Sequence, residues 1–387
     1  MEQQAKWKSE KEMESGNQSL AALETPCLMI DAERMERNIE KMADVARQHG
    51  VKLRPHAKTH KMPSIALQQI AAGAVGITVA KVSEAEVMAA HGVSSIFIAY
   101  PLVTESKIER AIRLSERIEL IVGVDSLAGA QRLEQTASRL GHSLQVRLEI
   151  DTGFRRTGVL YEQAELLACA IAGMPHLRLT GIYTFRGAIL AGKPTLDLAA
   201  AGKEEGELMV QLAERIRAQG IAITDVSVGS TPTAAYAAAV DGVTEVRPGT
   251  YVFQDRMQAR YGVCSLADCA GSVLVTVVSR PSADLAIVDG GSKTFATDVQ
   301  PGTAPLQLAG FGHIVGLDDA LLVRMSEEHG MLQLGPEAQR SAGLEVGDRL
   351  RIIPNHICST VNLHNEVILQ RGETLERVPV LARGMLE

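Results

Sequence analysis

Aromatic residues, basic runs and long apolar stretches are all scarce in this sequence of 387 residues. Only 3% of the residues are aromatic, which argues against a base-stacking surface for single-stranded nucleic acid. The formal net charge is −7 and no basic run occurs, so we expect no nucleic-acid partner. No apolar stretch reaches the ~18 residues that a membrane-spanning helix needs, so we expect no membrane partner either.

Cysteines are also few and scattered. The five of them are an odd number with wide spacing, which predicts no disulfide framework and favours a reducing compartment. The first residues are charged and lack the apolar core of a secretory signal. A cytoplasmic protein is therefore expected. The hydrophobic fraction of 46% is that of a globular chain with a large core.

Short β-branched runs alternate with amphipathic stretches over the first two thirds of the chain. This rhythm predicts a (β/α)8 barrel. A doubly wound open sheet is the competing architecture, but no G-x-G-x-x-G motif follows the first predicted strand. The eight predicted strands are Leu28–Asp31, Val51–Arg54, Val75–Ala80, Ser95–Tyr100, Ile118–Val124, Leu144–Ile150, Leu177–Thr184 and Ile223–Gly229.

From Tyr261 onward the pattern changes to strand-like runs joined by Gly, Pro and Asp turns. We therefore predict three regions. Residues 1–24 are a flexible lead-in that stands free or joins the β domain, residues 25–258 form the barrel, and residues 259–387 form a mostly-β domain. The predicted strands of that domain are Ser272–Ser279, Ala283–Asp289, Arg349–Pro354, Val361–Leu369 and Leu375–Ala382.

A lysine stands directly after the second predicted strand, in the segment RPHAKTHK at residues 54–61. Barrel active sites lie at the C-terminal ends of the strands, so Lys58 is a candidate site residue. Desolvation and the nearby cations His56 and His60 would lower the pKa of its amine and make it nucleophilic. A basic surface loop is the alternative interpretation.

Three further loops contain glycine beside arginine or hydroxyl residues: DTGFRRTG at 151–158, GSTPT at 229–233 and RPGTY at 247–251. In the first, glycines would let a guanidinium approach an anionic ligand. The second opens a predicted helix with a proline in its first turn, so its N–H groups and hydroxyls form a candidate phosphate cradle. Together with Lys58, these loops predict a phosphorylated carbonyl ligand such as pyridoxal phosphate.

A histidine and a cysteine stand two residues apart in the C-terminal region, as His356 and Cys358. On an extended chain both side chains would share one face, with Ile357 on the other. Imidazole and thiolate suit zinc or a neighbouring transition metal. Two ligands are fewer than a closed site uses, and a buried core cysteine is the alternative. His329 and His364 are either further ligands or ordinary histidines.

With these motifs, the chain resembles the fold-type III pyridoxal-phosphate enzymes, and within them the D-threonine aldolase and D-serine dehydratase group, over residues 25–385. The resemblance implies that Lys58 forms the Schiff base with pyridoxal phosphate and that Arg156 contacts its phenolic oxygen. It also assigns to the cofactor site Tyr183 and the residues of two phosphate-binding loops, Gly229, Ser230, Thr231, Gly249, Thr250 and Tyr251.

The same resemblance places a divalent metal, zinc or manganese, on His356 and Cys358 of the motif PNHICSTVNLH. Aldolases of the group often carry Asp where Cys358 stands, whereas the dehydratases carry Cys. The segment FIAYPL at 97–102 is instead more similar to low-specificity D-threonine aldolases. In YTFRG at 183–187, some relatives have His at the position of Arg186 and another soon after, so the base assigned there does not carry over.

The resemblance therefore implies a metal-dependent lyase that acts on β-hydroxy-D-amino acids and forms a homodimer. The first choice is a D-threonine aldolase, giving glycine and acetaldehyde, with Lys58 and His60 as catalytic residues. His60 and metal-bound hydroxide are the candidate bases. A D-serine dehydratase, giving pyruvate and ammonia, is the alternative. An amino-acid racemase, which needs no metal, is more distant. A non-catalytic carrier of the cofactor is disfavoured because carriers resemble the barrel alone, without residues 259–387.

Overall fold

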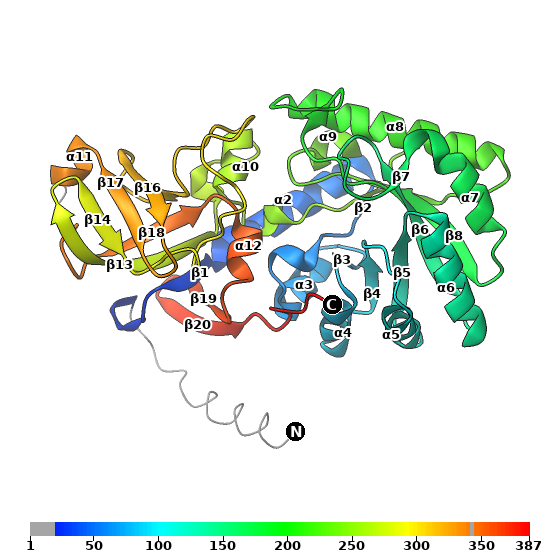
Figure 1. The fold of residues 1–387 in the computed structure, drawn as a ribbon, viewed down its shortest axis with the longest axis horizontal. Helices are drawn as coiled ribbons and strands as arrows, with labels where there is room; N and C mark the ends of the chain where they lie inside the picture. Colours follow the sequence, from blue (N-terminus) through cyan, green and yellow to red (C-terminus); the bar gives the residue numbers. More distant parts are fainter. Residues whose placement is uncertain (1–19, 341–343) are drawn as a thin grey trace, which may run out of the picture.

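The structure is a computed structural model that describes residues 20–340 and 344–387. Two parts lie side by side, a barrel and a β domain, with the long helix α2 (Ala32–His49) between them (Figure 1). Helix α2 contacts strand β2 (Lys52–Leu53) of the barrel and strand β19 (Glu366–Arg371) of the β domain. The C-terminus returns to the barrel, where the N–H of Ser83 donates to the backbone oxygen of Glu387 at 3.4 Å.

Eight parallel strands form the barrel sheet, in the order β2-β12-β11-β8-β6-β5-β4-β3. The two end strands meet through a parallel bridge between His56 and Thr78, and the Thr78 N–H donates to the carbonyl of Pro55 at 2.8 Å. The predicted barrel architecture is thereby confirmed. The remaining strands are β3 (Ile77–Val79), β4 (Ser95–Ile98), β5 (Glu119–Val124), β6 (Leu144–Asp151), β8 (Leu177–Tyr183), β11 (Asp225–Val228) and β12 (Glu245–Val246).

Helices surround this sheet and follow the amphipathic pattern of the sequence. In α2, Met35, Ile39 and Met42 are buried on one face. Asp31 caps its start by accepting the N–H of Arg34 at 2.9 Å, and Gly50 ends it with a φ of 64°, a conformation that favours glycine. The other barrel helices are α3 (Pro63–Ala71), α4 (Val82–Ala90), α5 (Glu105–Ser115), α6 (Leu127–Arg139), α7 (Ala164–Ala172), α8 (Leu198–Ala218) and α9 (Ala234–Ala238).

The β domain is a nine-stranded sheet in the order β14-β17-β16-β15-β18-β13-β1-β19-β20. Strand β14 also pairs with β13, so six of the strands close on themselves around a core that includes Val275, Leu322 and Ile352. Two short helices, α11 (Pro336–Arg340) and α12 (Ile357–Val361), belong to this part. Its strands are β1 (Cys27–Asp31), β13 (Gly271–Ser282), β14 (Leu285–Val288), β15 (Gly312–Ile314), β16 (Ala320–Met325), β17 (Gly330–Leu334), β18 (Arg349–Pro354), β19 and β20 (Thr374–Pro379).

Two strand assignments of the barrel differ from the prediction, and three strands of the β domain, β15, β16 and β17, were not predicted. The run Leu28–Asp31 was expected to open the barrel, but β1 lies in the β domain between β13 and β19. Both of its faces are buried, and such a run has the same sequence pattern whether it lies in a parallel or a mixed sheet. The eighth barrel strand is instead β12, which is only two residues long and too short to show periodicity. The GSTPT and RPGTY loops therefore follow the seventh and eighth strands.

The described part of the expected lead-in packs on the β domain. Leu23 is buried together with Met29, Leu274 and Ile368, and the carbonyl of Leu20 accepts from Arg349 at 2.6 Å. The rest of that lead-in, residues 1–19, lies outside the described residues. In the described ranges, no helix is both long and apolar enough to cross a bilayer.

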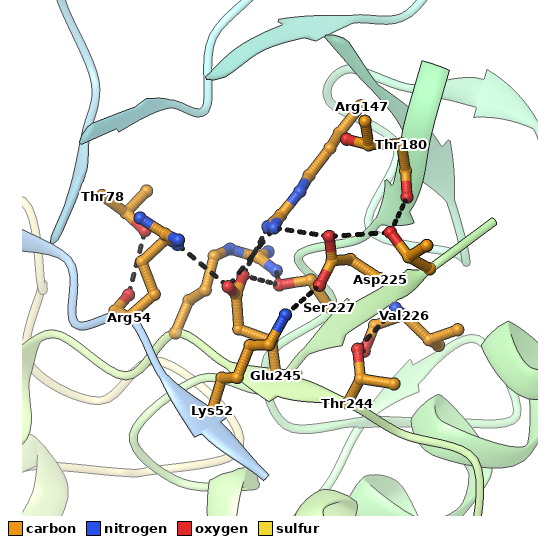
Figure 2. A network of polar contacts seen from close by, with 12 residues as sticks. Lys52, Arg54, Thr78, Arg147, Thr180, Asp225, Val226, Ser227, Thr244 and Glu245 are labelled. Atoms are coloured by element: carbon orange, nitrogen blue, oxygen red, sulfur yellow. Dashed lines mark hydrogen bonds and ion pairs between the residues drawn. The ribbon is translucent and has the colours of Figure 1, made fainter. Parts of the chain in front are cut away.

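Buried charges link the strands of the barrel (Figure 2). Glu245 on β12 accepts from Arg54 Nε at 2.9 Å and from Arg147 Nη1 at 2.5 Å. Asp225 pairs with Arg147 at 3.1 Å and with Lys52 at 2.9 Å. Burial alone would raise the pKa of Glu245, but Arg147 and Arg54 lower it to about 2. The network thus ties β2, β6, β11 and β12 together.

Replacing Glu245 by glutamine is expected to lower the free energy of unfolding by about 3–5 kcal/mol, because Arg54 and Arg147 would remain buried without their shared carboxylate. Urea denaturation measures this loss, with the exposed Glu373→Gln as control. Folding lowers the pKa of Glu245 from 4.5 to about 2. Its contribution to the free energy of unfolding is therefore complete above the pKa of the unfolded state and is lost as the pH falls toward about 2. A loss below about 1 kcal/mol would contradict this role.

Candidate active site

A cavity of about 1000 Å³ lies between the barrel and the β domain, at the C-terminal ends of the barrel strands. This is the place and the size expected of a small-molecule site in a barrel enzyme. Residues that follow β2, β6, β8, β11 and β12 line it, and the β domain contributes helix α12 and its flanks. The sequence-predicted residues that line the cavity are Lys58, Arg156, Tyr183, Gly229, Ser230, Thr231, Gly249, Thr250, His356 and Cys358.

Lys58 lies in a single 3-10 turn, Ala57–Thr59, directly after β2. His56 caps this turn, because its Nδ1 accepts the N–H of Lys58 at 3.3 Å. The amine lies 5.3 Å from the ring centroid of Phe185, and no hydrogen bond or ion pair reaches it from the described residues. Burial lowers the pKa of Lys58, and nearby arginines act in the same direction. The thiol of Cys358 acts in the opposite direction. A partly buried amine whose pKa is lowered is suited to act as nucleophile and base.

Arg156 is the arginine of the DTGFRRTG loop that faces the cavity. Asp151 shapes the loop by accepting the N–H groups of Gly153 at 2.9 Å and Arg155 at 3.1 Å. Arg155 points to solvent, with 74% of its side chain exposed, whereas the Arg156 guanidinium lies 5.0 Å from the ring of Phe154. Within the described part of the chain, Arg156 has no carboxylate partner, so its charge is available to an anionic ligand.

Two loops present N–H and hydroxyl groups at one side of the cavity. Gly229 has a φ of 84°. Gly249 lies in a tight space, because a Cβ there would lie 3.0 Å from the carbonyl oxygen of His56. The helix after GSTPT begins at Ala234 and has only five residues, later and shorter than predicted. The loop donors themselves, rather than a long helix dipole, are therefore what a phosphate would meet.

A buried carboxyl supports the first of these loops. Glu205 of α8 accepts the N–H of Gly229 at 3.3 Å and the hydroxyl of Thr233 at 3.1 Å. Together, a lysine amine with a lowered pKa, an arginine without a carboxylate partner and two loops of phosphate donors match the carbonyl, phenolic oxygen and phosphate of pyridoxal phosphate. The residues present thus fit the cofactor that the resemblance implies.

Two predicted residues do not reach the cavity. His60 is fully buried behind the lysine turn, with Nδ1 accepting from the Met62 N–H at 3.0 Å and Nε2 lying 3.2 Å from Gln69 Oε1. Burial lowers the pKa of His60 to about 4. Tyr251 is also buried, and its hydroxyl accepts from Gln69 at 2.9 Å. Both were expected at the site because they belong to its motifs, but they pack the layer behind it.

His356 and Cys358 lie on the β-domain side of the cavity. They are not on an extended chain, as the sequence suggested: β18 ends at Pro354, His356 precedes α12, and Cys358 is in its first turn. Their side chains still come together. Burial disfavours both charges, yet the two groups stabilise each other, so the pKa of His356 is raised well above its usual value and that of Cys358 is lowered.

Partners from three segments hold this pair. Asp298 Oδ2 lies 2.6 Å from His356 Nδ1. The hydroxyls of Thr59 and Thr250 lie 3.1 Å and 3.4 Å from the sulfur of Cys358, which links the pair to the lysine turn and the glycine loop. In the described ranges no group of three or more His, Cys, Asp or Glu side chains is arranged to hold a metal. The donors present fit a soft divalent ion with positions left open to water or substrate.

Five charged residues that the sequence analysis did not assign also line the cavity: Lys61, Glu149, Arg186, Arg247 and Asp298. Glu149, at the end of β6, accepts from Thr157 at 2.9 Å and Tyr183 at 3.1 Å, and burial raises its pKa. Arg247 donates to the carbonyl of Thr184 at 2.5 Å. Arg247 stands in the RPGTY motif, but the strand directly before it, β12, was not among the predicted strands, so its place at a strand end gave no signal. Arg186 was noted only as a departure from relatives.

Comparisons with known proteins agree with this geometry. Residues 30–257 match the family described as alanine racemase, N-terminal domain, and residues 270–370 match the putative serine dehydratase domain. The chain is 39% identical to D-threo-3-hydroxyaspartate dehydratase of Delftia sp., over 88% of this chain and 93% of that protein. It is 31% identical to D-threonine aldolase of Arthrobacter sp., over 94% of each.

Solved structures show the same arrangement. The crystal structure of D-threonine aldolase from Filomicrobium marinum superposes with a TM-score of 0.84 at 30% identity, covering 95% of this chain and 98% of that one. Two mutants of D-threo-3-hydroxyaspartate dehydratase, one histidine-to-alanine and one cysteine-to-alanine in the metal-free form, each superpose with a TM-score of 0.86 at 36% identity. Each match covers 94% of this chain, and it covers 96% of the histidine mutant and 98% of the cysteine mutant. The two mutated positions are two residues apart, the spacing of His356 and Cys358.

Proposed function

The chain belongs to the D-threonine aldolase and D-serine dehydratase family of fold-type III pyridoxal-phosphate enzymes and is thus a pyridoxal-phosphate-dependent lyase. Within this family, we propose that it is a dehydratase of β-hydroxy-D-amino acids. It would remove the β-hydroxyl and the Cα proton and release a 2-oxo acid and ammonia. The observation that carries the proposal is that Lys58 and the His356–Cys358 pair line one cavity from opposite parts of the molecule.

Each side chain has a definite task in this proposal. Bound pyridoxal phosphate supplies an electron sink for negative charge at Cα. The amine of Lys58, partly buried and with a lowered pKa, accepts the Cα proton at Nζ. Arg156 and the two glycine loops bind the anionic groups of the cofactor. His356 and Cys358 would hold a divalent ion, whose chemistry is to polarise a hydroxyl oxygen; their soft donors favour zinc over manganese.

The aldolase that the sequence favoured becomes the second candidate. Retro-aldol cleavage needs a base for the β-hydroxyl proton, and His60, one of the two expected bases, packs behind the site. Elimination needs a base at Cα, which Lys58 supplies. One observation supports the aldolase as second candidate. His56 lines the cavity, and burial together with nearby cations lowers its pKa, so a neutral imidazole is available as a base.

Product analysis separates these activities. Purified enzyme is stripped with chelator, reloaded with pyridoxal phosphate and zinc or manganese, and given D-serine, D-threonine and 3-hydroxy-D-aspartate. We expect metal-dependent formation of 2-oxo acid and ammonia in equal amounts. Glycine with an aldehyde as the main products would establish the aldolase instead. Racemisation without metal would overturn both.

A further inference from the structure

Arg186 is a buried cation whose donors are largely unused. It lines the cavity and is only 2% exposed, and its Nε and Nη1 atoms find no hydrogen-bond partner among the described residues. Its Nη2 lies 2.9 Å from Glu204 Oε1. Leaving charged donors desolvated and unpaired is costly, so native structures usually keep such a group for a ligand or for water.

Glu204 holds the guanidinium in place without neutralising it fully. This residue of α8 is 32% exposed, and its second oxygen accepts the N–H of Ala191 at 3.0 Å. Ala191 lies in the turn of a small hairpin, β9 (Ile189–Leu190) and β10 (Lys193–Pro194). One carboxylate is therefore shared between a backbone turn and one nitrogen of Arg186. This anchors the side chain beside the cavity and leaves its Nε and Nη1 atoms buried without a partner among the described residues.

The charges that line the cavity are unbalanced. Five lysine and arginine side chains line it against two carboxyls. One carboxyl, Asp298, is paired with His356, and the other, Glu149, has a pKa that burial raises. Lys61 is paired with Glu84 at 3.1 Å. Once Lys58 and Arg156 are assigned to the cofactor, as proposed above, two arginines remain. Arg247 donates to Ser227 and to the carbonyl of Thr184, which hold it in place. The carboxylate that pairs with Arg186, Glu204, is not among the residues that line the cavity.

We propose that Arg186 binds a second carboxylate of the substrate, on its side chain, so that the preferred substrates are acidic β-hydroxy-D-amino acids of the 3-hydroxy-D-aspartate class. The inference rests on the proposed function and narrows its substrate. With such a substrate, the Cα–H and Cβ–O bonds break, water leaves, and hydrolysis of the released enamine takes up one water. The products are a 2-oxo dicarboxylic acid and ammonia, with no change in oxidation state overall.

A phosphate oxygen offers the same chemistry as a carboxylate, and Arg186 lies close enough to lower the pKa of Glu205 behind the GSTPT loop, against the larger effect of burial. Experiments must therefore separate the substrate from the cofactor. Binding of D-aspartate, which has the second carboxylate but no hydroxyl, and of D-alanine, which lacks both, is measured on the holoenzyme by the absorbance change of the cofactor. Affinity of the apoenzyme for pyridoxal phosphate is measured separately.

For Arg186→Gln, we expect the dissociation constant of D-aspartate to rise by about 100-fold, as for loss of one partner of a buried charge pair, while that of D-alanine changes by less than about threefold. Specificity measured as kcat/KM should fall in parallel for 3-hydroxy-D-aspartate and not for D-serine. Arg186→Lys should recover part of the D-aspartate affinity. The matched control Glu204→Gln removes the anchor but keeps the cation, and should retain the preference for D-aspartate over D-alanine.

Equal losses of affinity for D-aspartate and D-alanine would overturn the inference. So would a drop of about tenfold or more in the affinity of the Arg186→Gln apoenzyme for pyridoxal phosphate, because that result would assign Arg186 to the phosphate. Failure of the dehydratase proposal would give a different experimental result. In that case the wild type forms no 2-oxo acid from any substrate, while D-aspartate still binds through Arg186.

Discussion

Replacing Lys58 by alanine is expected to reduce turnover at least about 1000-fold, because the variant loses both a nucleophilic amine and the base for the Cα proton. Pyridoxal phosphate should then separate from the protein on gel filtration, whereas in the wild type it stays bound. Lys61, the other lysine that lines the cavity, cannot substitute, since its amine is paired with Glu84 at 3.1 Å. Steady-state kinetics and the absorbance of the eluted protein provide the two measurements.

A matched control keeps this result specific. Lys293→Ala removes an exposed lysine of the β domain, paired with Glu328 at the surface, and should leave turnover and cofactor retention unchanged. Adding a small amine such as methylamine to Lys58→Ala should restore part of the turnover, because the amine can enter the space that the side chain leaves. Retained activity in the variant without added amine would show that another group is the base, and Lys58 would lose its assigned role.

Changing His356 or Cys358 to alanine is expected to lower metal-dependent turnover by at least about 100-fold, since even the loss of a residue that only hydrogen-bonds to a metal ligand costs up to that much. Each variant should also lose the metal that the wild type retains after dialysis, measured by elemental analysis. Retention of pyridoxal phosphate should be unaffected, because the pair comes from the β domain and the cofactor loops come from the barrel. Chelator treatment of the wild type should reproduce the loss, and zinc should reverse it.

The control for this experiment is Cys169→Ala, an exposed cysteine on a barrel helix. It removes a thiol of the same chemistry far along the sequence from the motif and should leave both metal content and turnover as in the wild type. Full turnover of Cys358→Ala with no bound metal would refute the metal requirement. The activity would then have to be explained by the barrel residues alone, as in a racemase.

The general architecture was predictable because it depends on repeated local patterns. Amphipathic spacing, as in Met35, Ile39 and Met42, predicts a helix wherever the face is buried. The pattern changes near Tyr261, ten residues before β13 begins at Gly271. Which sheet an individual strand joins was harder to predict. Strand β1 is buried on both faces and therefore looks the same in either sheet, and β12 is too short to have a period.

The candidate site divides in the same way. Motif residues on turns directly after strands, such as Lys58 and Gly249, line the cavity because the strand end determines where they lie. His60 belongs to the same motif, yet it is two residues further along the 3-10 turn and points into the core. Motif membership thus located a segment, and the backbone turn within it decided which side chains face the ligand.

By itself, the sequence determined the alternation of strands and helices, the loops that carry the chemistry and the residue types needed for a cofactor and a metal, because all of these are local properties. Only the tertiary structure decided which of these residues meet. Closing the barrel brings Arg156 and Lys58 to one rim, and docking of the β domain places Cys358 within 3.1 Å of Thr59, from which it is separated by 299 positions in the chain. It also left the guanidinium of Arg186 buried with unused donors, a consequence of packing that no local pattern records.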